Sequence, residues 1–184
     1  GVEDSLVDDA VKRIASSYVP WQENSFPGLL GNVVAGRISR HFNFGGTNCV
    51  VDAACASSLS AIHLALLELY TGKSSMVVTG GVDTTNDIFM HMCFSKPMVL
   101  STTGDARPFS QDADGTVLGE GIGLFVLKRL EDAQKDGNRI YAVIKGVGSS
   151  SDGKSQSIYA PRIQGQFQRE IGTDRRFHLG NRFN

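Results

Sequence analysis

Cys55 is the residue whose type and setting are best suited to chemistry. It stands in Val50-Val-Asp-Ala-Ala-Cys-Ala-Ser-Ser-Leu, where a short apolar strand is expected to run directly into a helix. The first turn of a helix has free backbone N–H groups and a partial positive charge. Both favour a thiolate over a thiol, and the same N–H groups can hold an oxyanion during acyl transfer. The pattern predicts a cysteine nucleophile; the alternative is a small cysteine packed between strand and helix.

The other candidate nucleophiles lack such a setting. Cys49 and Cys93 fit the interpretation of packed cysteines, because Cys49 lies in or beside the apolar strand. Ser57 and Ser58 lack the Gly-x-Ser-x-Gly turn of serine hydrolases. We therefore interpret both serines as polar residues of the first helical turn.

Neither the histidines nor the acidic residues form a recognisable site. His63 follows Cys55 by two helical turns, about 12 Å, which is too far for direct base catalysis. Asp112, Asp114 and Glu120 lie close in sequence, but no glutamate closes a calcium loop there, so turn formation is the favoured role. The remaining histidines lack the spacing of a metal site (His41, His91 and His178). The sequence predicts no metal site.

The elements that must position Cys55 alternate between helices and strands. Apolar periodicity predicts helices over 4–17, 30–41, 57–70 and 128–136. Short apolar runs predict strands over 49–53, 76–81, 121–127 and 139–148, with a long loop-rich stretch over 83–116. Such alternation indicates an α/β domain with a layered sheet.

Composition excludes several classes of function. Eighteen Lys+Arg against 19 Asp+Glu in 184 residues argues against a nucleic-acid arm or a polybasic membrane patch. No apolar run approaches the roughly 18 residues of a membrane-spanning helix. Three cysteines are too few and too irregular for a disulfide framework or a zinc site. We expect a soluble cytoplasmic protein with a cysteine free for chemistry.

Several motifs together resemble the β-ketoacyl synthase (ketosynthase) domain. The resemblance runs in order from about Phe26 to Gln166. The amino-acid sequences of Gly46–Cys55 and Ser149–Gln166 resemble those of iterative type I synthases that make polyunsaturated fatty acids, enediyne polyketides or heterocyst-type glycolipids. The matching motifs are Gly31-Asn-Val-Val-Ala-Gly-Arg-Ile-Ser, Asp52-Ala-Ala-Cys-Ala-Ser-Ser-Leu, Thr79-Gly-Gly-Val-Asp, Phe94 through Leu100-Ser, Arg107-Pro-Phe-Ser, Ala113-Asp-Gly-Thr-Val-Leu-Gly-Glu-Gly-Ile-Gly and Val126-Leu-Lys-Arg-Leu-Glu-Asp-Ala.

The resemblance implies a thiolase-like fold with α-β-α-β-α layers, of which this chain holds mainly the N-terminal half. We expect a partial synthase domain over 1–166 and an atypical tail over 167–184, a misread frame or a truncation. The family's two catalytic histidines and its lysine belong to His-Gly-Thr-Gly-Thr and Lys-x-x-x-Gly-His motifs, which this sequence does not contain. His178 has no Gly-Thr context. We therefore expect the 184 residues alone to be inactive.

The resemblance also implies a reaction, a decarboxylative Claisen condensation. Cys55 would take an acyl chain from a phosphopantetheine thioester, and a malonyl unit on acyl carrier protein would lose CO2 and attack it. The domain itself would bind no cofactor. Phe94 would lie near the acyl pocket with Met92 close by, although both could instead be ordinary core residues. Other implied partners are further domains of the synthase and a second copy of the chain, paired through the strand near Met76–Gly80.

Two other functions stay open at this stage. One is a non-catalytic ketosynthase-like dimer partner, which retention of Cys55 argues against because such partners typically lose that cysteine. The other is a thiolase-type cysteine acyltransferase, which works without decarboxylation and uses a second cysteine.

Overall fold

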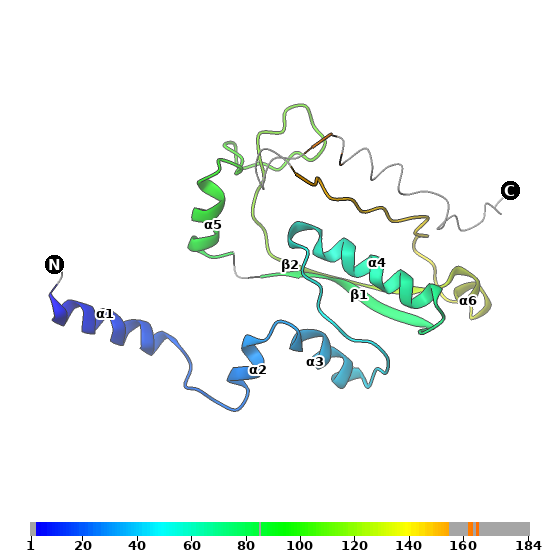
Figure 1. The fold of residues 1–184 in the computed structure, drawn as a ribbon, viewed down its shortest axis with the longest axis horizontal. Coiled ribbons are helices and arrows are strands. Elements are labelled where there is room, and N and C mark those ends of the chain that lie inside the picture. Colours follow the sequence, from blue (N-terminus) through cyan, green and yellow to red (C-terminus); the bar gives the residue numbers. More distant parts are fainter. Residues whose placement is uncertain (1–2, 85, 155–161, 164, 166–184) are drawn as a thin grey trace. The chain divides into compact units, whose positions relative to one another are not determined.

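The structure is a computed structural model that describes residues 3–84, 86–154, 162–163 and 165 (Figure 1). The predicted tail over 167–184 and half of the distinctive segment Ser149–Gln166 lie outside these residues. The chain divides into two compact units, Gly1–Asp52 and Ala53–Asn184. Each unit is described by itself.

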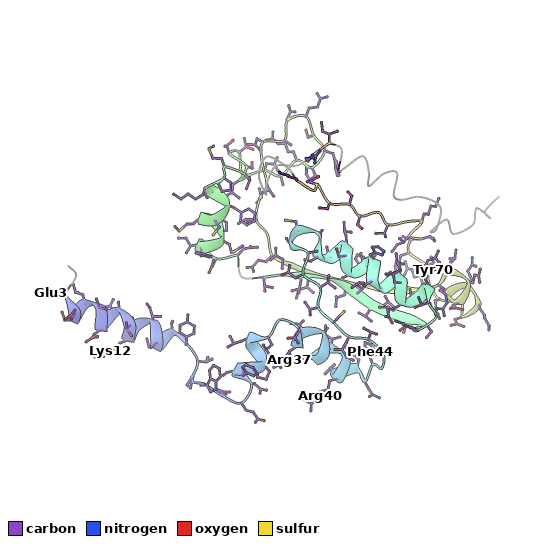
Figure 2. All side chains as sticks on the ribbon, viewed as in Figure 1. Glu3, Lys12, Arg37, Arg40, Phe44 and Tyr70 are labelled. Atoms are coloured by element: carbon purple, nitrogen blue, oxygen red, sulfur yellow. The ribbon has the colours of Figure 1, made fainter. Side chains whose placement is uncertain are left out.

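The first unit contains three helices, α1 (Asp4–Ser17), α2 (Ser25–Leu29) and α3 (Val33–Phe42). The prediction over 4–17 is confirmed. The predicted helix over 30–41 begins later, at Val33, and the short helix α2 was not predicted. α3 ends at Asn43, whose φ of 54° is the left-handed conformation typical of a helix terminus. Figure 2 shows the side chains of this unit, with Arg37 and Arg40 labelled on α3.

The second unit holds the predicted nucleophile. It contains a 3-10 turn η1 (Ala54–Ala56), α4 (Ser57–Tyr70), β1 (Met76–Asp83), α5 (Ile88–Ser95), β2 (Gly121–Lys128) and α6 (Leu130–Lys135). The predicted helix over 57–70 is confirmed, and the strand predicted over 121–127 is one residue longer. The helix predicted over 128–136 begins at Leu130, after Arg129.

β1 and β2 form an antiparallel pair, with Thr79 opposite Phe125 and Gly81 opposite Gly123. α4 packs against β1, and Figure 1 shows it lying along the strands. Among the described residues the buried side chains are few: Ala65, Leu69, Thr79 and Ala133. Two of these four belong to α4 and one to β1, so the interior of this unit lies where helix and strand meet.

Arg129 holds the far end of α4 in place. Its Nη1 donates to the carbonyls of Leu69 (2.7 Å) and Ser74 (3.0 Å), and its Nε donates to Asp132 at 2.6 Å. The last helical carbonyls lack partners within the helix, and the bond to Leu69 adds one there, so that Arg129 joins the end of α4 to the start of α6. Tyr70, the last residue of α4, is labelled in Figure 2.

Three sequence predictions about this fold were wrong. Residues 49–53 and 139–148 form no strand, because a strand needs a hydrogen-bonded neighbour and the described residues pair only β1 with β2 as named strands. β1 does not stop at Gly80 and Gly81 but continues to Asp83. The loop-rich stretch over 83–116 contains one helix that was not predicted, α5, which begins where the Asp87 carboxylate accepts from the Met90 N–H at 3.0 Å.

Candidate active site

The thiol of Cys55 is exposed in a tight turn at the start of α4. The residue is the middle one of η1, and α4 begins two residues later. The alternative of a cysteine packed between strand and helix does not describe this position, because the side chain is exposed and no strand precedes it. Cys49 and Cys93 are exposed as well, so neither is packed as expected.

The backbone around Cys55 is strained. Ala54 has a φ of 49°, the left-handed region that a residue with a Cβ avoids. Such a conformation persists only where the surrounding structure holds it. The Ala56 N–H donates to the carbonyl of Ala53 at 3.0 Å, which closes the turn beneath the cysteine.

Ser57 adds two hydrogen bonds to the same turn. Its hydroxyl accepts from the Ala53 N–H at 2.8 Å and donates to the carbonyl of Ala54 at 2.7 Å. The interpretation of Ser57 as merely a polar residue of the first helical turn understates its role. The signal that could have identified it is its spacing, since a serine three or four residues after a backbone group can bond back to that group.

The amino end of α4 suits a negative charge. Ala56 is the residue before the helix, and no side chain caps the first turn. Helical N–H groups in the first turn have no partner within the helix and carry a partial positive charge. Cys55 stands two residues before the start of α4, so the N–H groups of the first helical turn are candidates to hold an oxyanion formed on an acyl group at its sulfur.

Gly81 sets how closely β1 approaches this turn. A Cβ built on Gly81 would lie 2.8 Å from the Cβ of Ser58, in the first turn of α4. Only glycine permits this contact without movement of the helix, which explains a glycine inside β1. The start of α4 therefore rests directly on the strand.

The two predicted acyl-pocket residues lie on another helix. Phe94 is half-buried and Met92 is 57% exposed, both on α5. Figure 1 shows α5 beyond the end of the strands, and α5 has no extensive packing against α4 or η1. Phe94 and Met92 thus lie on a different element from Cys55, and their place in an acyl pocket stays a prediction.

His63 lies on α4, half-buried, two turns beyond the start of the helix. This position agrees with the expectation that it does not serve Cys55 as a base. Among the described residues, no group of three His, Cys, Asp or Glu side chains could hold a metal ion. In that same part of the chain, no helix is long and apolar enough to cross a membrane.

The acidic residues near 112–120 have separate partners. Asp114 accepts from the hydroxyls of Ser101 (2.7 Å) and Thr102 (2.8 Å) and from the backbone N–H groups of Thr102 and Thr103, each at 3.0 Å. Glu120 instead accepts from the Asn86 N–H at 2.7 Å. The hydroxyl of Ser101, followed by that of Thr102, holds the pKa of Asp114 well below its usual range. Asp114 thus organises a loop, a larger role than the predicted turn formation.

The amino-acid sequence of the chain matches one protein family and is similar to large synthases. Residues 8–133 match the family described as "Beta-ketoacyl synthase, N-terminal domain". The chain is 48% identical over 166 residues, 90% of its length, to a polyunsaturated fatty acid synthase subunit of Thraustochytrium sp.. It is 40% identical over 148 residues, 79% of its length, to the probable polyketide synthase 28 of Dictyostelium discoideum. Its residues span 6% of each of these two relatives.

Solved structures agree with the sequence relatives. The ketosynthase from module 6 of the bacillaene synthase of Bacillus subtilis superposes with a TM-score of 0.72 and 35% identity, covering 82% of this chain and 28% of that one. An oxazolomycin ketosynthase domain of Streptomyces albus gives a TM-score of 0.70 and 32% identity, covering 77% of this chain and 26% of that one. The predicted thiolase-like α/β fold is confirmed, with this chain representing part of it.

Proposed function

The chain belongs to the β-ketoacyl synthase family, and on that premise we propose that the protein containing it elongates acyl chains by decarboxylative Claisen condensation. The observation that carries the proposal is the exposed Cys55 in the strained turn at the uncapped amino end of α4. This turn lies inside the matched residues 8–133.

In the first half-reaction, the Cys55 thiolate attacks the carbonyl of an acyl thioester carried on phosphopantetheine. The phosphopantetheine thiol leaves, and the acyl group stays on the Cys55 sulfur. The N–H groups at the start of α4 support both the thiolate and the oxyanion of the tetrahedral intermediate. A thioester is reactive enough that this step needs no strong base.

In the second half-reaction, a malonyl thioester on acyl carrier protein loses CO2. The resulting carbanion attacks the acyl carbonyl on Cys55, the thiolate leaves, and a β-ketoacyl thioester remains on the carrier. We propose that residues outside these 184 stabilise the carbanion, because the family's histidine and lysine motifs do not occur in this sequence. Phosphopantetheine enters as part of the substrates, so the domain needs no cofactor of its own.

We infer the class of product from the sequence identity to each relative. Identity to the polyunsaturated fatty acid synthase relative is 48%, against 40% for the Dictyostelium polyketide synthase. We therefore favour an iterative synthase of the type that makes long polyunsaturated acyl chains. We also favour a cytoplasmic location, because an exposed nucleophilic thiol is preserved best where thiols stay reduced.

The proposed partners are acyl carrier protein, other domains of a multidomain synthase and a second copy of the chain. Within the described residues β1 pairs only with β2, so its other edge is open over Met76–Gly80. An open edge of unpaired backbone groups is a template for another strand. We propose that the equivalent strand of a second copy pairs there, which size-exclusion chromatography of the complete domain tests directly.

The non-catalytic alternative and the thiolase alternative make different predictions for the same assay. The complete domain is supplied with an acyl thioester and malonyl-acyl carrier protein, and carrier-bound β-ketoacyl product and CO2 are measured. We expect both products from the native domain. Cys55→Ala should lower condensation by several orders of magnitude, up to roughly 10⁶-fold, while some malonyl decarboxylation remains. Condensation unaffected by Cys55→Ala would refute the proposal, and product formed without CO2 would favour a thiolase.

A further inference from the structure

The hydroxyl of Ser57 holds the two residues on the amino-terminal side of Cys55. It accepts from the N–H of Ala53 and donates to the carbonyl of Ala54, at 2.8 and 2.7 Å. These two bonds cross the turn from the carboxyl side of Cys55 to its amino side. Along the chain, Cys55 therefore lies between Ser57 and the two residues to which the Ser57 hydroxyl bonds.

The backbone conformation that these bonds hold at Ala54 is energetically unfavourable. The φ of 49° at Ala54 is unfavourable for any residue with a Cβ, and Ala54 is the residue directly before Cys55. Relaxation of this angle would change the course of the backbone directly before Cys55. Both bonds of Ser57 end on residues that must move in that relaxation.

The other side of the turn is fixed independently. Ser58, the next residue of α4, rests on Gly81 of β1 so closely that a Cβ on Gly81 would lie 2.8 Å from it. The helix start is thus seated on the strand, and on the amino-terminal side of Cys55 the Ser57 hydroxyl bonds to Ala53 and Ala54.

We propose that Ser57 is a positioning residue for Cys55, its hydroxyl keeping the thiol at the amino end of α4. This inference rests on the proposed role of Cys55 as the acylated nucleophile. The chain offers good controls. Ser57→Thr keeps a hydroxyl at the same position, Ser58→Ala removes the neighbouring hydroxyl while leaving both bonds of Ser57 in place, and Cys49 and Cys93 are exposed reference thiols.

The test compares the native complete domain with Ser57→Ala, Ser57→Thr and Ser58→Ala. Two rates are measured at Cys55 by peptide mass spectrometry: acylation by a short-chain acyl thioester and alkylation by iodoacetamide. Alkylation of Cys49 and Cys93 is followed in the same samples, and thermal unfolding is recorded for each variant. We expect Ser57→Ala to slow both reactions of Cys55 by about 10- to 100-fold, because small misplacement of a reacting group has effects of that size.

The pattern across the variants decides the matter. The reference cysteines should react as in the native domain, and Ser57→Thr and Ser58→Ala should keep most of the Cys55 reactivity. An unchanged Cys55 rate in Ser57→Ala, or altered alkylation of all three cysteines together, would overturn the positioning role. Failure of the native domain to acylate Cys55 would instead refute the proposed function on which this inference rests.

Discussion

All three cysteines have exposed side chains, so accessibility does not single out Cys55. What distinguishes it is the backbone that carries it: a left-handed residue directly before it, and the uncapped end of a 14-residue helix that begins two residues after it. Helix-end electrostatics act over about one turn, and of the three cysteines only Cys55 stands just before the amino end of a helix in the described residues.

At the residue scale, Phe94 offers a test of the acyl pocket. If Phe94 lines the acyl tunnel, Phe94→Ala should change the length of the products while the free energy of unfolding falls by less than the roughly 3–5 kcal/mol of a buried phenylalanine. The half-buried position of its side chain is compatible with that smaller loss. Product lengths and thermal unfolding are measured together, with Phe89→Ala, which is 65% exposed on the same helix, as control. A large loss of stability with unchanged products would identify Phe94 as core.

A second prediction at this scale concerns Asp114, whose carboxylate joins four hydrogen-bond donors of the 101–103 segment. Asp114→Asn should increase hydrogen exchange at the amides of Thr102 and Thr103 several-fold, since both donate to the same carboxylate oxygen. Asp112→Asn, whose side chain does not join this network, is the control. Unchanged protection of the two amides in Asp114→Asn would contradict the account.

The same carboxylate gives a prediction about pH. Hydrogen bonds hold the pKa of Asp114 well below the unfolded value of about 3.9. A lowered pKa in the folded state contributes stability that is complete above the unfolded pKa and is lost as pH falls through the folded pKa. Native protein should therefore lose stability more steeply than Asp114→Asn below about pH 5. Parallel acid-unfolding curves for the two proteins would show that Asp114 contributes nothing.

How much of the site the sequence predicts depends on the range of the contacts. The helix that follows Cys55 is readable because its apolar periodicity is local, whereas the strand predicted before it does not form. The role of Ser57 is also local but does not stand out in the sequence, because its hydroxyl bonds only once the turn has formed. The contact of Gly81 with Ser58 joins residues 23 positions apart, and no local pattern indicates it.

At the scale of elements, β1 and α4 form the base of the site. Gly81→Ala should displace the first turn of α4, because the new Cβ would meet the Cβ of Ser58 at 2.8 Å. We expect a loss of about 1–3 kcal/mol in stability together with slower alkylation of Cys55. Gly123→Ala is the matched control, since Gly123 lies opposite Gly81 and a Cβ there meets nothing within 4 Å. Equal effects of the two substitutions would show that the close approach of strand and helix has no special role.

The elements themselves were predicted unevenly. α1 and α4 have clear helical periodicity and match their predicted bounds, and β2 differs by one residue. The predicted strands over 49–53 and 139–148 failed because a strand requires a partner, which its own residues do not supply. α5 was missed because Ile88–Ser95 is apolar on most sides and lacks the polar face that identifies a surface helix.

At the scale of the whole molecule, much apolar surface is uncovered. Cross-strand partners share a face, and on the face opposite α4 large side chains are 52–71% exposed (Val82, Ile122, Leu124 and Val126). A thiolase-like domain packs two similar halves against each other, and an open apolar sheet face is what such packing covers.

When they are expressed alone, the 184 residues should therefore fail to condense substrates and should aggregate. Loss of preorganised donors typically costs about 10²–10³ in rate for each one, and the family's histidine motifs do not occur in this sequence. Carrier-bound product and light scattering are measured for residues Gly1–Asn184 beside the complete domain. Turnover near the rate of the complete domain would show that the residues needed for condensation do not lie outside these 184.

The central claim is that Cys55 carries the acyl group, and the most direct measurement is the location of that group. The complete native domain is incubated with a labelled acyl thioester in the absence of malonyl substrate, digested, and mapped by peptide mass spectrometry. We expect the label on the peptide containing Cys55, released by hydroxylamine as a thioester is, and absent from Cys55→Ala. Stable labelling of Cys49 or Cys93 with Cys55 unmodified would contradict the account.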